Sequence, residues 1–184
     1  MSQVDLPGLA ERIRAIAYLE GDFLLRSGRR SRFYLDKYLF ETDPLVLRDV
    51  GIAIAGILAV EPRPPERIAG PELGAVALAA SASLQSGIPF LIVRKEAKGY
   101  GTDRRLEGAY VSGERVVLVE DVLTSGGAAI AAVGALRGAG LECSRVIGIV
   151  DREEGAREAL EEAGLELTAL FDATALRLGE PTSR

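Results

Sequence analysis

Two adjacent carboxylates, Glu120 and Asp121, stand between a short apolar run and a turn rich in hydroxyls and glycine. The apolar run is 116–119, and the turn occupies 122–128. Backbone N–H groups of a glycine-rich turn that opens a helix can hold a phosphate, and hydroxyls add donors. Carboxylates placed just before such a turn suit a ligand with hydroxyls near a phosphate, such as a ribose 5-phosphate. The alternative is an ordinary strand–turn–helix connection in which Asp121 caps the helix.

A second group of chemically capable residues is the cationic set Arg94, Lys95 and Lys98. The segment 95–109 is polar, contains glycines and lacks periodicity, which predicts a loop. Cations on a loop near a phosphate site would neutralise a polyanion, although by themselves they also suit a solvated surface loop. The third lysine and two nearby acidic residues are expected on the surface: Asp36, Lys37 and Asp43.

Composition excludes several kinds of chemistry. The chain has no histidine, which removes His-based acid–base catalysis and His-ligated metals, and its lone Cys143 allows neither an intrachain disulfide nor a Cys-cluster metal site. A net charge of −5 argues against a general nucleic-acid binder, which would be basic. The longest apolar stretch, 50–60, is too short to cross a bilayer, and no signal peptide is visible, so we expect a cytoplasmic protein without a membrane partner.

The elements that must position these residues follow from periodicity and turn signals. Helical spacing of apolar residues predicts a helix over 6–19 with Asp5 as its N-cap, and short apolar runs around 27–31 predict a β-hairpin. Pro44 in the first turn predicts a helix over 42–60. The remaining predicted elements are strands at 67–69, 89–93, 116–119, 145–150 and 167–170, and helices at 74–86, 126–137 and 153–163.

Apolar strands that alternate with helices predict a parallel sheet covered on both faces, here from about residue 66 to residue 170. The first sixty residues read as a separate helix–hairpin–helix element over one edge or end of that sheet. Ligands of open parallel sheets bind beyond the carboxyl ends of the strands. Four segments fall there: 70–74, 94–108, 120–128 and 151–152.

Several segments of the chain resemble a known family. Residues 116–128 closely resemble the phosphoribosyl-pyrophosphate (PRPP) motif of type I phosphoribosyltransferases, an apolar strand, two acidic residues and a Thr/Ser/Gly turn. Four more segments resemble the orotate phosphoribosyltransferase family: a substrate hairpin at 23–36, a pyrophosphate loop at 70–74, a catalytic loop at 94–102 and an orotate-contacting strand end at 151–152. The resemblance covers about residues 5–178.

The resemblance implies a single α/β domain over 1–184 with the type I phosphoribosyltransferase fold. Its central, mostly parallel sheet would be flanked by helices, with a substrate hood at 1–40 and the α/β core at 66–170. The implied reaction joins orotate and PRPP to give orotidine 5′-monophosphate (OMP) and pyrophosphate, in UMP biosynthesis. It implies Mg²⁺ held mainly by PRPP and water, no protein metal site, and a homodimer whose subunits share active sites through Lys98.

The resemblance also implies roles for individual residues. The catalytic set would be Lys98, Asp121 and Glu120, with the two carboxylates on the ribose 2′- and 3′-hydroxyls. PRPP would contact Glu72, Leu73, Arg94, Lys95, Lys98, Glu120, Asp121, Val122, Leu123, Thr124, Ser125, Gly126, Gly127 and Ala128. Orotate would contact Arg26, Phe33, Tyr34, Thr124 and Arg152. For the last of these, a surface ion pair with Glu153 or Glu154 is the competing interpretation.

The chain departs from the family pattern at two positions. Tyr100 stands where many orotate enzymes have a loop histidine, and Gly74 stands where some members carry a lysine, which leaves proton transfer by the loop in question. The family's pyrophosphate loop often contains a non-proline cis peptide, which here would fall near Glu72–Leu73.

Three alternatives stay open on the sequence. They are a phosphoribosyltransferase for a purine base, a PRPP-sensing regulator without catalysis, and an unrelated nucleotide-binding α/β domain. A purine enzyme would ordinarily lack the Ser27–Gly28 hairpin and the paired Lys95 and Lys98.

Overall fold

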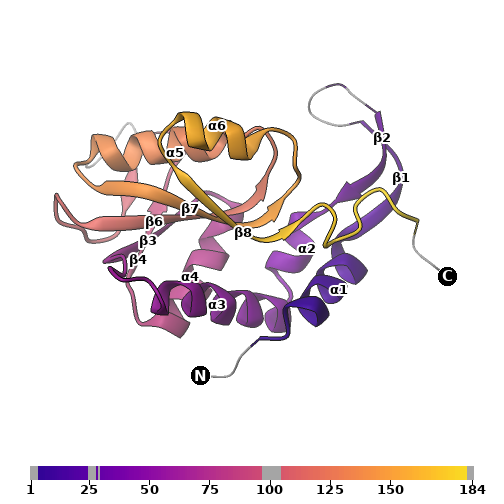
Figure 1. The fold of residues 1–184 in the computed structure, drawn as a ribbon, viewed down its shortest axis with the longest axis horizontal. Coiled ribbons are helices and arrows are strands. Elements are labelled where there is room, and N and C mark those ends of the chain that lie inside the picture. The colour runs from indigo at the N-terminus through magenta and orange to yellow at the C-terminus, as the bar shows by residue number, and fades with distance from the viewer. Residues whose placement is uncertain (1–3, 25–27, 29, 97–104, 182–184) are drawn as a thin grey trace.

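The computed structural model describes residues 4–24, 28, 30–96 and 105–181. Its centre is a six-stranded sheet in the order β5-β4-β3-β6-β7-β8 (Figure 1). Every neighbouring pair is parallel except β4 and β5, which are antiparallel. The strands are β3 (Arg67–Pro71), β4 (Phe90–Val93), β5 (Leu106–Glu107), β6 (Arg115–Leu123), β7 (Glu142–Asp151) and β8 (Glu166–Asp172). The predicted mostly parallel sheet is confirmed.

Helices cover both faces of this sheet (Figure 1). One face carries α5 (Gly127–Gly138) and α6 (Ala156–Glu162), and the other carries α3 (Pro44–Ala59) and α4 (Gly74–Ser86). Side chains alternate along β6, so that Val117 packs into the cluster with α3 and α4 while Leu118 packs into the cluster with α5 and α6. Burial on both sides explains why the strand is apolar at consecutive positions.

The first sixty residues begin with α1 (Leu6–Ala17), the antiparallel hairpin of β1 (Tyr18–Leu24) and β2 (Arg30–Leu35), and α2 (Lys37–Glu41). The hairpin forms its own two-stranded sheet and projects to one side of the molecule (Figure 1). The helices do not form a separate unit, because Ile13 of α1 and Ile54 of α3 share one buried cluster with Val117. The hydrophobic core therefore begins well before residue 66.

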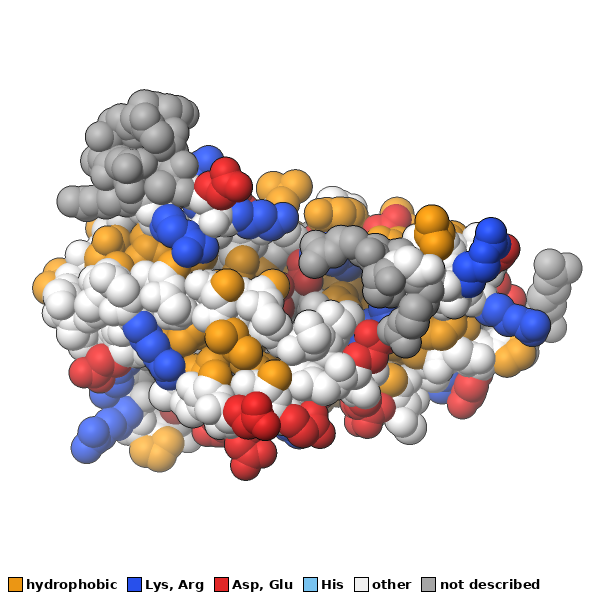
Figure 2. Space-filling model, turned by 90° about the horizontal axis from the view of Figure 1, so that it is seen from above, with side chains coloured by type: hydrophobic (Ala, Val, Ile, Leu, Met, Phe, Trp, Pro, Cys, Tyr) orange, Lys and Arg blue, Asp and Glu red, His pale blue; other side chains and the backbone are white. Residues whose placement is uncertain are grey.

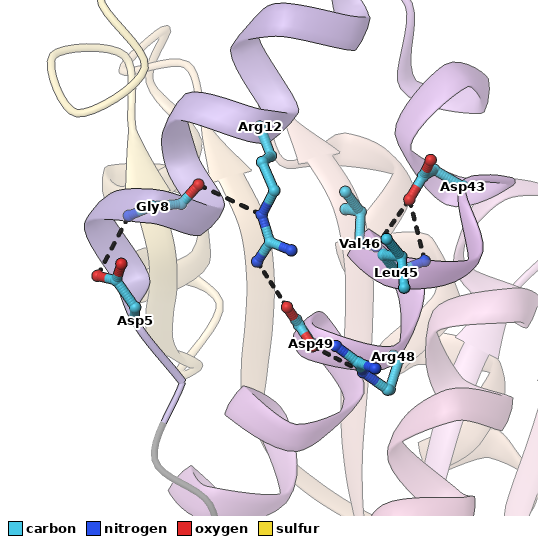
Figure 3. A network of polar contacts seen from close by, with 8 residues as sticks. All are labelled: Asp5, Gly8, Arg12, Asp43, Leu45, Val46, Arg48 and Asp49. Atoms are coloured by element: carbon cyan, nitrogen blue, oxygen red, sulfur yellow. Dashed lines mark hydrogen bonds and ion pairs between the residues drawn. The ribbon is translucent and has the colours of Figure 1, made fainter.

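A polar network joins α1 to α3 (Figure 3). Arg12 Nη2 lies 2.5 Å from Asp49 Oδ2, and Arg48 Nη2 lies 2.9 Å from Asp49 Oδ1. Burial alone would raise the pKa of Asp49, but the hydrogen bonds from the two arginines outweigh it and leave the pKa below its usual value. Asp43 caps α3 through Leu45 N and Val46 N at 3.0 and 2.9 Å.

The carboxyl-terminal segment is held against α1 and the base of the hairpin. Arg14 is buried, donates to the Leu176 carbonyl at 2.7 Å and lies over the Tyr18 ring at 4.2 Å. This contact fixes where the hairpin leaves the core. Within the described residues, no helix combines the length and the hydropathy that a membrane crossing needs.

Most predicted elements are present, with several differences. The first helix was predicted to end at residue 19 but ends before residue 18, where β1 begins. The short helix α2 was not predicted, since five residues show too little periodicity to be recognised. Strand β6 continues through Leu123, so Glu120 and Asp121 lie within it and not after it. The last helix begins at Ala156 and not at residue 153, because Gly155 has a φ of 96° and Glu153 a φ of 56°, neither of them helical. The two-residue β5 lies in the predicted loop 95–109.

Candidate functional site

A cavity of about 490 Å³ opens at the carboxyl ends of β3, β4 and β6. Its position agrees with the rule that ligands of parallel sheets bind at this edge. Figure 2 shows a hollow near the middle of one face, with acidic and basic side chains interspersed around it. The charged residues that line the cavity are Lys37, Glu72, Arg94, Lys95, Arg105, Glu120 and Asp121.

Asp121 is held from two sides. Its Oδ2 lies 2.6 Å from Lys37 Nζ, and its Oδ1 accepts a hydrogen bond from the Val122 N–H at 2.5 Å. The side chain is only 3% exposed. Burial alone would lower the pKa of Lys37, but the hydrogen bond and negative charge of Asp121 outweigh it and raise that pKa above its usual value. Lys37 was predicted on the surface, and that prediction was wrong because the helix that carries it was not recognised.

Two further carboxyls beside Asp121 have strongly raised pKa values. Burial, followed by the charge of Asp121, raises the pKa of Glu120 to about 8 and that of Glu41 also to about 8. A hydrogen bond between Glu41 and Asp121 adds to the raised pKa of Glu41, whereas Glu120 Oε2 is buried without a hydrogen-bond partner within the described chain. Buried polar atoms are normally paired, and unpaired ones mark places where a ligand or water completes the bonding. Glu41 was not predicted as a site residue, because it lies on the same unpredicted helix as Lys37.

The turn after β6 forms a shallow cradle. Residues Leu123 to Ala129 border a small cavity of about 90 Å³, and Thr124 and Ser125 are exposed beside it. Helix α5 begins at Gly127, so its unpaired N–H groups and positive dipole end face the cradle. Gly126 has a φ of 76°, and a Cβ there would lie 3.2 Å from the Ala156 carbonyl oxygen. The cradle therefore has the form that the sequence predicted for a phosphate.

The segment between β3 and α4 crosses in front of the acidic pair. The Glu72–Leu73 peptide is cis, as expected. Glu72 N donates to the Val93 carbonyl at 2.9 Å, and Glu72 Oε1 accepts from Lys95 N at 2.7 Å, so this segment is tied to the end of β4. A Cβ on Gly74 would lie 1.9 Å from Asp121 Oδ2, which shows how closely α4 approaches the carboxylate.

A cationic wall follows β4. Arg94 and Lys95 line the main cavity together with Arg105, which was not predicted as a site residue. Arg94 N donates to the Arg105 carbonyl at 2.8 Å, and Arg105 Nε donates to the Arg94 carbonyl at 3.2 Å. Arg94 Nε is buried and has no partner within the described residues. The antiparallel pairing of β4 with β5 brings Arg105 here, and a two-residue strand leaves no sequence pattern that could have revealed it.

The hairpin and the end of β7 meet on the other side. The Arg152 guanidinium lies 5.8 Å from the centre of the Phe33 ring, and it also pairs with Glu154 Oε1 at 2.9 Å. Phe33 stacks on Tyr18 at 5.4 Å. Tyr34, one residue on, points to the opposite face of the strand and packs 5.6 Å from Phe23.

The structure thus brings most of the predicted residues to one edge of the sheet. Glu72, Leu73, Arg94, Lys95, Glu120, Asp121, Val122 and Thr124 line one cavity, Ser125, Gly126, Gly127 and Ala128 line the adjoining cradle, and Leu123 borders that cradle. Asp36 and Asp43, predicted on the surface, serve as N-caps of α2 and α3. Arg26, Lys98 and Tyr100 lie outside the described residues.

Comparison with known proteins defines the class. Residues 41–163 match the phosphoribosyl transferase domain, and that segment contains the acidic pair, the cradle and the cationic wall. The chain belongs to the phosphoribosyltransferase family.

The relatives narrow this class. The chain is 47% identical to an orotate phosphoribosyltransferase of Methanocella arvoryzae over 85% of this chain and 87% of that one. It superimposes with a TM-score of 0.85 on an orotate phosphoribosyltransferase of Mycobacterium tuberculosis solved with Fe(III) dicitrate, at 33% identity over 95% and 99% of the two chains. The same enzyme in complex with PRPP gives a TM-score of 0.80 at 30% identity, over 95% and 99%. Within the family, the similarity is to the orotate phosphoribosyltransferases.

Proposed function

We propose that this protein is an orotate phosphoribosyltransferase. It transfers the 5-phosphoribosyl group of PRPP to orotate, releases pyrophosphate and forms OMP for UMP synthesis. The observation that carries the proposal is the meeting, at one edge of the sheet, of an acidic pair, a phosphate cradle and a cationic wall. Each part matches one portion of PRPP: the ribose hydroxyls, the 5′-phosphate and the pyrophosphate.

The donor is proposed to lie along β6 and its turn. Asp121 and Glu120 bind the ribose 2′- and 3′-hydroxyls, and residues 122–128 hold the 5′-phosphate at the N-terminus of α5. Arg94 and Lys95 face the pyrophosphate, as does the backbone at Glu72–Leu73. Lys98 completes this set from the catalytic loop.

The acceptor is proposed to lie between the hairpin and the end of β7. Orotate carries a carboxylate, which the Arg152 guanidinium can bind, and a flat ring, which an aromatic side chain such as Phe33 can cover. Arg26 and Thr124 complete this set. Tyr34, which packs on Phe23, would have to turn away from that contact to reach the same ligand. Residues 1–40 then act as a hood over the site.

The chemistry calls for charge stabilisation more than for a general base. Glycosyl transfer through an oxocarbenium-like state builds negative charge on the departing pyrophosphate, and preorganised cations aimed at that charge are the expected device. Arg94 and Lys95 supply them from the end of β4. The acidic pair orients the sugar, and Glu120, which burial keeps protonated, can donate one hydrogen bond to a ribose hydroxyl.

Mg²⁺ is proposed to be held mainly by the phosphates of the donor and by water. The acidic residues of the site leave the ion to the phosphates and water, since burial keeps Glu120 and Glu41 neutral and Lys37 bonds Asp121. In the residues that the structure describes, no three acidic, histidine or cysteine side chains are grouped as metal ligands. The ion supplies charge neutralisation on the pyrophosphate when bound.

A homodimer with shared active sites is part of the proposal, with Lys98 reaching the neighbouring subunit's site. Full activity of a monomer at nanomolar concentration would overturn it. A cytoplasmic location, with neither nucleic acid nor membrane as a partner, is also proposed, and a chain with one cysteine suits a reducing compartment.

The direct test is the loss of orotate absorbance with PRPP and Mg²⁺. Adenine, guanine, xanthine and uracil are run in parallel and analysed by product chromatography. Turnover of orotate alone is the expected result. Turnover of another base would leave the assignments for PRPP in place and overturn those for orotate. Binding of PRPP without any turnover would indicate a sensor.

The loop assignment has its own test. Lys98→Ala is expected to lower turnover by roughly 10²–10³, the usual effect of removing one group that stabilises developing charge, with little change in the thermal midpoint. Unchanged turnover would reject the assignment of residues 94–102 as the catalytic loop.

A further inference from the structure

The short helix α2 brings a cation into the acidic part of the site. Lys37 lies 84 residues before Asp121 in the sequence, yet its Nζ is 2.6 Å from Asp121 Oδ2 and its side chain is two-thirds buried. Asp36 caps α2 by accepting a hydrogen bond from Tyr38 N at 3.2 Å, and strand β2 of the hairpin ends directly before this cap. The cap and the hairpin therefore fix the start of α2, and Lys37, its first residue, lines the cavity.

The charge balance around Asp121 depends on this lysine. The charge of Asp121 acts on Glu120 of the same strand and on Glu41 of α2, while Lys95 acts on Glu120 from the end of β4. In the part of the chain that the structure describes, Lys37 is the one cation that bonds Asp121 directly. Without it, Asp121 would lie beside two further carboxyls with no ammonium in contact.

The orientation of Asp121 depends on the same contact. Its Oδ1 is occupied by the Val122 N–H, and its Oδ2 is bounded by the Lys37 ammonium on one side and by the start of α4 on the other. A Cβ on Gly74 would lie 1.9 Å from Oδ2 and 2.8 Å from Glu41 Oε1, so no side chain at position 74 can share this space with the carboxylate as it now lies. A cation that bonds Asp121 Oδ2 must therefore come from an element other than α4, and Lys37 of α2 provides it.

We propose that Lys37 is a positioning residue for phosphoribosyl transfer, which holds the Asp121 carboxylate oriented to accept a hydrogen bond from a ribose hydroxyl of the donor. This inference rests on the proposed function. The charged and titratable groups around the pair are Asp36, Tyr38 and Glu41 from α2 and its cap, Glu120 from β6, and Glu72, Arg94, Lys95 and Arg105 from the cavity wall.

The test is steady-state kinetics of Lys37→Met. The KM for PRPP is expected to rise roughly ten- to a hundredfold, the range for one charge-assisted hydrogen bond, with a smaller loss in kcat. Arg63→Met, an exposed change of the same charge, is the matched control and should leave KM and kcat unchanged.

Chemical rescue keeps the test independent of folding. Lys37→Cys, alkylated in the folded protein with 2-bromoethylamine, regains an ammonium at nearly the same reach and should recover the KM for PRPP. Alkylation with iodoacetamide adds a neutral group and should not. Wild-type protein treated in parallel controls for Cys143, which is buried.

Each failure has a distinct signature. A Lys37→Met variant with a lowered melting temperature but an unchanged KM for PRPP would overturn the inference and make the ion pair merely structural. Equal recovery with both alkylating reagents would also overturn it. Absence of turnover in the wild type would instead count against the proposed function.

Discussion

Asp49, between α1 and α3, and Asp121, at the end of β6, are both buried carboxylates, but their surroundings differ in charge. Asp49 meets two guanidiniums, from Arg12 and Arg48, and its pKa is lowered. Asp121 meets one ammonium and has two further carboxyls nearby, whose pKa values are raised to about 8. The first cluster satisfies itself within the fold.

The second cluster is incomplete without a ligand. Glu120 Oε2 is buried and has no hydrogen-bond partner within the described residues, and Glu120 lines an open cavity. A fold tolerates such a group only where something else stabilises the chain, and here the apolar contacts on both faces of the sheet do so. The contrast predicts that removing charge from the first cluster affects stability and removing it from the second affects activity.

The largest expected effect is that of Asp121→Asn. Turnover should fall by roughly 10²–10³, since one charged contact to the reacting sugar is weakened. The free energy of unfolding should change less than it does in Asp49→Asn, because Asp121 bonds one ammonium whereas Asp49 bonds two guanidiniums. Urea unfolding and the orotate assay measure the two quantities. Retained turnover with lost stability would reverse the contrast.

The pH dependence of stability distinguishes the two clusters next. Glu120 and Glu41 titrate near 8 in the folded state and near 4.5 unfolded, so the folded state binds more protons between these values. Their contribution is present below about 4.5 and is lost as pH rises toward 8. Ligand-free urea unfolding at several pH values measures it.

Glu120→Gln should reduce this loss, because the amide cannot ionise. Asp49 acts in the opposite sense: its lowered pKa contributes stability above the usual carboxyl pKa, and this is lost as pH falls through the folded value. An unfolding free energy that rises from pH 5 to pH 8 in the wild type would refute the assignment of neutral carboxyls at the site.

Arg152 tests how far the functional cluster extends along the sheet edge. Arg152→Ala should raise the KM for orotate roughly ten- to a hundredfold and the KM for PRPP much less, because a charged hydrogen bond to the acceptor is lost. Glu154→Ala, which removes the observed ion-pair partner, is the control and should change neither constant strongly. Equal losses for both substrates would contradict a contact with the base.

The smallest expected effect is that of Asp49→Asn on stability. The change should lower the free energy of unfolding by about 1 kcal/mol, because a neutral amide bonds the two half-exposed arginines less strongly. Turnover should be unchanged, since Asp49 lies between α1 and α3 and does not line the cavity. A loss of turnover without a loss of stability would mean that the α1–α3 contact is coupled to the site.

Local pattern alone determined much of this protein. The apolar run before Glu120 and Asp121, the hydroxyl and glycine turn after them, and the helical spacing of 74–86 each depend on residues adjacent in the chain, and the sheet, the cradle and the family followed from them. The signal of Pro44 in a first helical turn is equally local, which is why the start of α3 was predicted close to the observed one.

Only the tertiary structure decided which residues far apart in the sequence meet at the site. Lys37 and Glu41 come from a five-residue helix too short to show periodicity, and they reach Asp121 because the hairpin and α4 place that helix against β6. Arg105 joins the cationic wall through a two-residue strand. Phe33 and Tyr34 are equivalent in the sequence, but the pleat of β2 turns one toward Arg152 and the other away. Spacing along the chain carries none of this, because contact across elements is set by packing.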